Sequence, residues 1–411
     1  MVKRVYDISV IRIDGRRGVM VDQLSGLDSR TLDVLYELYQ RGPLTKKDLQ
    51  EAMDLKPTTL NRAMKALEQR KLILSSGETE STGGRKATAY DVTHQDLYLI
   101  GIDLSRTYVK LVLTNLKLSI VKMDTFPLNE QYSAEKTIST TLLLTERMLR
   151  ESAISKHQIL GIGVGTVGPL DREQGVMLSP QGFPNPNWGD VALKDYIERS
   201  LSIPCFVDNG ANAAVLAEYR FGIGRNKQSV AYIHCGIGIR SAVIKDGMMI
   251  RTMNDREDAF GNMIMLLQEP AGRETIESAS SLGAIIHAIA ADLKLGRDEL
   301  NEENYREVLK NMPGKQEAIQ KIIRERAGLF GIGLSNFSRL LTPDVIILSG
   351  PLMINVEEYY RTCIAAFYRN YHSPDAILFS KGGIFQEDTI AIGSAAMVLD
   401  CCCKAKSVMR K

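Results

Sequence analysis

The chain of 411 residues has little of what secreted and membrane proteins depend on. Its six cysteines, three of them consecutive at positions 401–403, lack the spacing of a disulfide framework. No apolar run reaches the roughly 20 residues that a membrane-spanning helix needs. The polar, basic start is unlike a signal peptide. We therefore expect a cytoplasmic protein with reduced cysteines and no membrane partner.

An excess of either charge is also missing, because 51 Lys and Arg stand against 49 Asp and Glu. This balance excludes a chain whose overall field attracts nucleic acid, so any DNA contact has to come from local clusters. The hydrophobic fraction of 44% and the charged fraction of 24% are those of a globular protein. At this length we expect two or three domains.

Three short helices are predicted near the N-terminus. Residues 30–42 carry leucines at helical spacing and stop at Gly42-Pro43. Thr45 and Asp48 have the spacing of a capping box, which opens a second helix. Pro57 suits the first turn of a third helix. Three short helices with a tight turn before the third are typical of a helix-turn-helix.

A short hairpin follows these helices and predicts a winged helix. Residues 72–74 and 89–92 have the composition of strands, and residues 81–86 form a glycine-rich basic tip between them. The third helix would enter the major groove of a double-stranded DNA operator, and the tip would reach the backbone or the minor groove. The alternative is a module that binds a partner protein with its basic face in solvent. The expected DNA-binding residues are Thr58, Thr59, Asn61, Arg62 and Lys65 of the helix and Arg85 and Lys86 of the tip.

The first 28 residues have two readings. Asp14-Gly15 could turn a hairpin, or Arg12, Arg16 and Arg17 could belong to a basic arm near DNA. We therefore expect three parts: an N-terminal arm or hairpin over 1–28, a winged helix-turn-helix over 29–96, and a larger domain over 97–411.

Strands alternate with helices from residue 97 onward. Apolar strands are predicted at 99–103, 108–113, 118–121 and 159–164, with a helix over 134–153 before the last of these. Further strands are predicted at 229–234 and 345–348. This order is typical of an α/β architecture with parallel or mixed sheets.

Five segments in this region resemble, in order and spacing, those of the ROK family (repressors, open reading frames and kinases). They are the glycine-rich 161–171 and the segments 179–188, 206–214, 340–350 and 392–396. The resemblance covers nearly the whole chain, wing included. It implies an α/β protein in which a winged helix-turn-helix precedes a two-lobed, actin-like sugar-kinase fold with a cleft between the lobes.

The resemblance also shows which parts of the kinase chemistry are missing. Gly210 stands where family kinases have the aspartate that takes the proton of the sugar hydroxyl, and glycine has no side chain to act as a base. Ser105, Arg106, Arg240 and Ala242 stand where glycines cradle the nucleotide phosphates. The resemblance therefore implies no catalytic residue, no enzyme activity and no cofactor.

The zinc and sugar sites of the family are depleted as well. Asn262 replaces the histidine of the family's zinc module, and no cysteine lies between Cys235 and Cys363, so no metal site is expected. Ala259 replaces a glutamate that binds sugar hydroxyls.

Two polar positions of the sugar site remain and are the expected effector-binding residues. Asn209 matches the asparagine before the lost aspartate, and Glu277 matches a carboxylate that clamps vicinal hydroxyls. The alternative is a cap for Asn209 and a solvated helix position for Glu277. His234 and Cys235 are adjacent on a strand and point to opposite faces, so we expect core residues rather than a catalytic pair.

The resemblance is to the family's DNA-binding repressors, such as those of xylose and N-acetylglucosamine genes. It predicts a transcriptional regulator, specifically a repressor of carbohydrate-related genes. The inactive kinase half would form a homodimer or a higher homo-oligomer and sense a sugar or sugar-phosphate effector. One alternative is a regulator that retains sugar-kinase activity. The other is a ligand-blind regulator that uses the kinase half only as a dimer scaffold.

Overall fold

The computed structural model describes residues 24–78, 87–93, 95–251, 258–268, 272–296, 298–373 and 376–404. The wing tip with Arg85 and Lys86, and residues 1–23 with Arg12, Arg16 and Arg17, lie outside these ranges. Within them, no helix is both long and apolar enough to cross a membrane.

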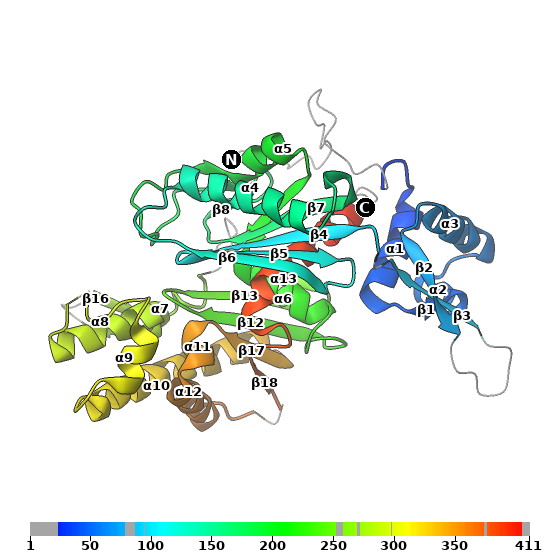
Figure 1. The fold of residues 1–411 in the computed structure, drawn as a ribbon. Helices are drawn as coiled ribbons and strands as arrows, with labels where there is room; N and C mark the ends of the chain where they lie inside the picture. Colours follow the sequence, from blue (N-terminus) through cyan, green and yellow to red (C-terminus); the bar gives the residue numbers. More distant parts are fainter. Residues whose placement is uncertain are drawn as a thin grey trace, which may run out of the picture.

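Three helices and a small sheet form the N-terminal module, at the right of Figure 1. Asp28 caps the first helix by accepting the Thr31 N–H, and Thr45 and Asp48 form the predicted capping box of the second. The sheet has the order β1-β3-β2. The three predicted helices are confirmed. The elements are α1 (Ser29–Arg41), β1 (Leu44–Thr45), α2 (Lys46–Met53), α3 (Pro57–Gln69), β2 (Ile73–Glu78) and β3 (Thr88–Val92).

The first lobe of the remaining chain is built on a five-stranded sheet of order β11-β7-β4-β5-β6. Helices α4 (Ala134–Glu151) and α5 (Leu193–Leu201) cover its outer face (Figure 1). The strand expected at 118–121 begins instead at Ile120, because Leu118 lies in a turn with a φ of 60°. The strands are β4 (Tyr98–Leu104), β5 (Tyr108–Asn115), β6 (Ile120–Pro127), β7 (Ile159–Thr166) and β11 (Cys205–Asn209).

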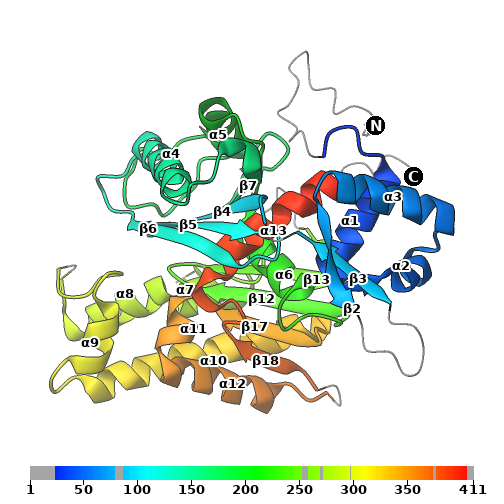
Figure 2. The ribbon, with the colours of Figure 1, turned by 45° about the vertical axis from the view of Figure 1, so that its right-hand side comes forward.

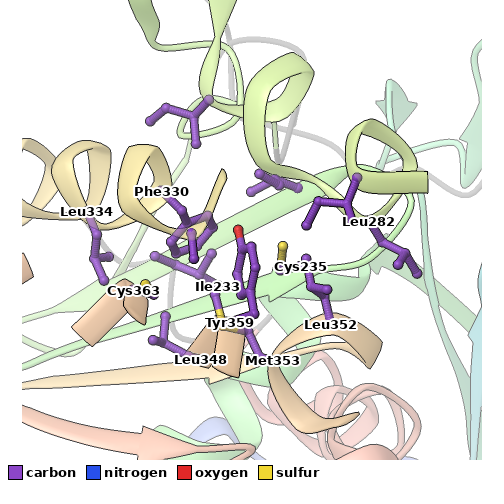
Figure 3. Packing of buried hydrophobic residues seen from close by; sticks show 14 of the residues in the cluster. Ile233, Cys235, Leu282, Phe330, Leu334, Leu348, Leu352, Met353, Tyr359 and Cys363 are labelled. Atoms are coloured by element: carbon purple, nitrogen blue, oxygen red, sulfur yellow. The ribbon is translucent and has the colours of Figure 1, made fainter. Parts of the chain in front are cut away.

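A second sheet, of order β14-β13-β12-β17-β18, forms the other lobe. Its outer face packs on α8, α10 and α12 through a large apolar core, which Figure 3 shows around Tyr359, Phe330 and Ile233. Its strands are β12 (Ser229–Cys235), β13 (Ile239–Lys245), β14 (Met248–Ile250), β17 (Val345–Ser349) and β18 (Leu378–Lys381). Its helices are α7 (Ile276–Ser280), α8 (Leu282–Leu293), α9 (Tyr305–Asn311), α10 (Gln316–Leu341), α11 (Pro351–Asn355) and α12 (Glu357–Asn370).

Short elements complete the two lobes. A 3₁₀ turn, η1 (Lys156–Gln158), precedes β7, and a second, η3 (Gln386–Asp388), precedes the C-terminal helix. Two small sheets have the orders β10-β9-β8 and β15-β16. Their strands are β8 (Leu170–Asp171), β9 (Val176–Met177), β10 (Val191–Ala192), β15 (Ile264–Gln268) and β16 (Gly272–Thr275).

Two helices, α6 (Gly210–Arg220) and α13 (Thr389–Lys404), lie between the two sheets, as Figures 1 and 2 both show. Their approach is close because glycines stand at the contacts. A Cβ atom on Gly163 of β7 would lie 1.8 Å from the Ser394 carbonyl oxygen, and one on Gly393 would lie 2.0 Å from that of Ala213. Since no side chain fits there, these glycines let α13 pass along the first lobe and against α6.

Candidate functional site

A cleft of about 620 Å³ opens between the two lobes. The first lobe contributes residues of β5 and β6 and of the turn that joins β4 to β5. The second lobe contributes β12, the glycine-rich turn 236–238, the start of β13, and residues near α9 and η3. The size suits a small-molecule ligand, for which pockets of about 300–1,000 Å³ are usual.

Gly210, the position without a catalytic carboxylate, is the first residue of α6 and lies next to Arg240 and Ile390, which line this cleft. A Cβ atom there would lie 3.1 Å from Arg240 Nη1 and 3.2 Å from Ile390 Cγ2. Arg240 is only 5% exposed and lines the cleft from β13. A guanidinium group therefore borders the space that a side chain at position 210 would enter.

Arg106 reaches into the same region from the first lobe. Its Nε donates a hydrogen bond to the Gln181 carbonyl oxygen at 2.8 Å. A Cβ atom on Gly238 would lie 3.4 Å from Arg106 Nη1 and 2.7 Å from Glu277 Oε2, so both side chains meet at this glycine. Arg106 and Arg240 both line the cleft, at positions where the resemblance leads us to expect phosphate-cradling glycines.

Two further titratable groups lie beside these arginines. His234 is 8% exposed, and burial together with the charges of Arg240 and Arg106 lowers its pKa well below the usual 6.5. Its imidazole is therefore neutral. Asp103 accepts a hydrogen bond from the Tyr108 hydroxyl at 2.8 Å. Burial raises the pKa of Asp103, while the charge of Arg240 opposes that shift.

His234 differs from the expectation of a core residue. It is buried, but it lines the cleft together with Tyr232, two positions earlier on β12. Cys235 and Ile233 point to the opposite face and belong to the apolar core of the second lobe. The alternation of a strand separates the two pairs. No local pattern in the sequence indicates which face of this strand borders the cleft.

The two expected effector-binding residues both bond to the chain's own backbone. The Asn209 side chain caps α6 by accepting the Asn212 N–H at 2.9 Å. Glu277 Oε2 accepts the Ile239 N–H at 2.6 Å. Asn209 is buried and Glu277 is half-buried. A ligand role for either residue stays a prediction.

Sequence reasoning missed the carboxylate of Asp208. It is 5% exposed, and Arg251 binds it with Nη2 at 2.9 Å from Oδ2. Asn212 Nδ2 donates to its other oxygen at 2.9 Å. Asp208 therefore ties the start of α6 to Arg251, which lies far along the chain. Across the described ranges, no three His, Cys, Asp or Glu side chains are grouped so that they could hold a metal ion.

The expected DNA-reading helix α3 presents its polar face to solvent. Thr58, Asn61, Arg62 and Lys65 are exposed and Thr59 is half-buried, whereas the apolar stripe of the helix is buried. Arg62 Nη2 lies 3.0 Å from Asp28 Oδ2, and Asn61 accepts a hydrogen bond from Lys46 at 2.9 Å. Exposed ion pairs contribute only about 0–1 kcal/mol, so Arg62 can leave Asp28 at little cost.

The N-terminal module is anchored to the end of α13 and to α6 (Figure 2). The Tyr36 hydroxyl of α1 donates a hydrogen bond to Asp400 of α13. Arg220, at the end of α6, donates to Gln40 at 3.0 Å. Apolar side chains of α1, α3 and α13 form one continuous core beneath these bonds. The helix that passes the cleft at Ile390 thus contacts the helix-turn-helix ten residues later.

These features define a class of protein: a winged helix-turn-helix joined to a two-lobed α/β core like that of sugar kinases, with glycine at the catalytic carboxylate position. The sequence model of the ROK family matches residues 99–400, so the chain belongs to the ROK family. The model of the MarR family matches residues 27–81, which span the three N-terminal helices. The predicted family and fold class are confirmed.

Individual relatives cover most of the chain. It is 24% identical over 385 residues to a putative xylose repressor of Caldicellulosiruptor sp. (strain Rt8B.4), covering 89% of this chain and 94% of the relative. It is 22% identical to the DNA-binding transcriptional dual regulator NagC of Escherichia coli (strain K12), covering 81% and 82%. Among solved structures, a ROK family transcriptional regulator described as a homologue of the E. coli MLC protein aligns with a TM-score of 0.73 at 18% identity, covering 93% of this chain and 99% of that one. This last likeness supports the fold alone.

Proposed function

We propose that this chain is a DNA-binding transcriptional repressor of carbohydrate-related genes, acting in the cytoplasm as a homodimer. The observation that carries the proposal is the pairing of an intact helix-turn-helix, whose third helix exposes its polar face, with a kinase-like half that has glycine at position 210. The names of the relatives, a xylose repressor and a DNA-binding regulator, agree with it.

A sugar-kinase activity is disfavoured by the cleft itself. Phosphoryl transfer needs a base for the attacking hydroxyl and an unobstructed cradle for the nucleotide phosphates. Gly210 supplies no base, and the side chains of Arg106 and Arg240 line the cleft where the resemblance expects glycines. We infer that the kinase half serves dimerisation and effector sensing rather than catalysis.

Helix α13 supports a route by which an effector could control DNA binding. Ile390, in its first turn, borders the site at Gly210, and Asp400 bonds to Tyr36 of the helix-turn-helix. A change in the angle between the lobes would shift α13, because it packs against β4 and β7 of one lobe and against α6. The α1 helix would follow through its contact with Asp400.

The ligand-blind scaffold is the second candidate function. It is favoured by the bonds that Asn209 and Glu277 make to backbone N–H groups of their own chain, since a side chain bonded in this way has less capacity left for a sugar hydroxyl. A set of sugars and sugar phosphates added to the protein–operator complex separates the two candidates. An effector changes the affinity for DNA in the first, and no compound changes it in the second.

The proposal is tested by selecting operator sequences from randomised duplex DNA with the intact chain. Lys65 is exposed on α3, so Lys65→Ala should weaken binding and reduce the slope of log Kd against log salt by about 1 if it contacts a phosphate. Lys321→Ala, on the exposed face of α10, is the matched control and should leave both unchanged. Selection that enriches no sequence, or equal effects of the two substitutions, would contradict the proposal.

A further inference from the structure

Arg62, on the exposed polar face of α3, is held by a side chain from outside that helix. Its Nη2 donates a hydrogen bond to Oδ2 of Asp28, the residue that caps α1, at 3.0 Å. The other carboxylate oxygen of Asp28 accepts the Thr31 N–H at 2.8 Å. Each oxygen of Asp28 has its own partner, so the helix cap and the ion pair exist at the same time.

The segment that carries Asp28 is fixed against α3. Arg70, at the C-terminal end of α3, donates from Nη1 to the Ser25 carbonyl oxygen at 2.6 Å. The hydrogen bond from the Thr31 N–H and, to a smaller extent, the charge of Arg62 lower the pKa of Asp28, so its carboxylate is ionised at neutral pH. The guanidinium of Arg62 therefore has a charged partner whose own position is fixed.

The adjacent Asn61 is restrained in a similar way. Lys46, at the start of α2, donates to its Oδ1 at 2.9 Å. The ammonium of Lys46 also lies 5.7 Å from the centre of the Tyr90 ring in β3. Two neighbouring side chains of the expected DNA-reading face are thus ordered, in the free protein, by residues that do not belong to α3.

The ion pair with Asp28 leaves Arg62 able to face DNA. A guanidinium carries five N–H donors in a planar fork, and 75% of the Arg62 side chain is exposed. A long side chain loses rotamer freedom when it binds a base, and a partner that orders it beforehand reduces that cost. The pair is weak in solvent, but DNA that covers α3 excludes water and strengthens the attraction.

We propose that Asp28 is a specificity-determining residue, which positions the Arg62 guanidinium for a bidentate contact with a guanine in the major groove. Arginine donates to both O6 and N7 of guanine, and this pairing discriminates against the other bases. The inference rests on the proposed function and names a residue that sets base choice within it. Because a carboxylate repels the phosphates of any sequence, Asp28 improves discrimination between sequences rather than affinity.

The test is the affinity of the intact chain for its selected operator and for duplexes that differ from it by one base pair. Asp28→Asn keeps a cap for α1, because asparagine caps helices as well as aspartate does, and places an uncharged amide opposite Arg62. Arg62→Ala should reduce the preference for guanine at one position about tenfold or more, and Asp28→Asn should reduce it about three- to tenfold at the same position. In the Arg62→Ala background, Asp28→Asn should have no further effect.

Asp54→Asn is the matched control. It removes another exposed carboxylate of the same module, at the end of α2, where a φ of 48° suits asparagine. It should leave the preference for guanine unchanged. Thermal unfolding shows whether Asp28→Asn keeps the wild-type Tm; if it does not, Asp28→Ser, which also caps without charge, repeats the measurement.

The same change in Kd for every duplex in Asp28→Asn would overturn the proposal, because Asp28 would then act only on the phosphates. An equal loss of preference in Asp54→Asn, or in the absence of Arg62, would overturn it as well. Selection that enriches no operator contradicts the proposed function and this inference with it. An operator whose base preferences are unchanged in Asp28→Asn contradicts this inference alone.

Discussion

The bond between Tyr36 and Asp400 provides the sharpest test of how the helix-turn-helix is held on the kinase-like half. The two residues are 364 positions apart and join α1 to α13. Burial and the neighbouring Asp400 carboxylate raise the pKa of Tyr36, so its hydroxyl remains protonated and donates at any usable pH. Hydrogen bonds to charged groups contribute about 1.5–3 kcal/mol.

Replacing Tyr36 by Phe removes this donor and keeps the ring. We expect the docking of the module to weaken by about 1.5–3 kcal/mol, a factor of roughly ten to a hundred in its opening equilibrium. The loss stays partial because the Arg220–Gln40 bond and the shared apolar core remain. Hydrogen exchange measured by mass spectrometry should show that amides of α1 and α3 exchange correspondingly faster, while those of β12 and β17 keep their protection.

Tyr196→Phe is the matched control, because Tyr196 is 55% exposed on α5. It should leave exchange unchanged everywhere. A double-mutant cycle with Asp400→Asn completes the test, since bonded partners should show a coupling energy of about 0.5–3 kcal/mol. Additive effects of the two substitutions, or wild-type exchange in Tyr36→Phe, would refute the assignment of this bond as an anchor of the module.

Two further predictions concern α13 and the catalytic position. Gly163→Ala should destabilise the fold by about 1–3 kcal/mol or more, because its Cβ would lie 1.8 Å from the Ser394 carbonyl oxygen. Gly189→Ala is the control and should not destabilise the fold, because a Cβ there has no atom within 4 Å. Urea unfolding of both variants checks this prediction, and equal midpoints would contradict it. Gly210→Asp should not create sugar-kinase activity in an assay with ATP. The new carboxylate would meet Arg240, and Arg106 and Arg240 would still line the cleft. Phosphorylated sugar above the wild-type background would show instead that the missing base alone disables the site.

Much of the N-terminal module could be predicted from the sequence because its signals are local. The Thr45–Asp48 capping box acts over three residues, and Pro57 begins α3 where a first-turn proline is tolerated. The alternation of strands and helices likewise predicted the α/β class. Glycine at position 210 could be recognised by its place between Asn209 and the alanine-rich helix.

Which side chains line the cleft depends on contacts between residues distant in the chain. No local pattern in the sequence indicates these contacts. His234 was expected in the core. The sheet lies between the helices of the second lobe on one face and the cleft on the other, and only this placement decided that His234 faces the cleft. Arg106 reaches Gln181 across 75 positions. Such contacts depend on the packing of the two lobes, and the residue types involved are compatible with many other partners.

By itself, the sequence determined the order of the modules, the α/β class and the absence of a carboxylate at position 210, because caps, periodicity and residue identity are properties of short segments. Only the tertiary structure decided that Arg106, Arg240 and His234 share one cleft, and that α13 connects this cleft to Tyr36 of the helix-turn-helix. The physical reason is that side chains distant in the chain become neighbours only when close packing fixes the positions of the elements that carry them.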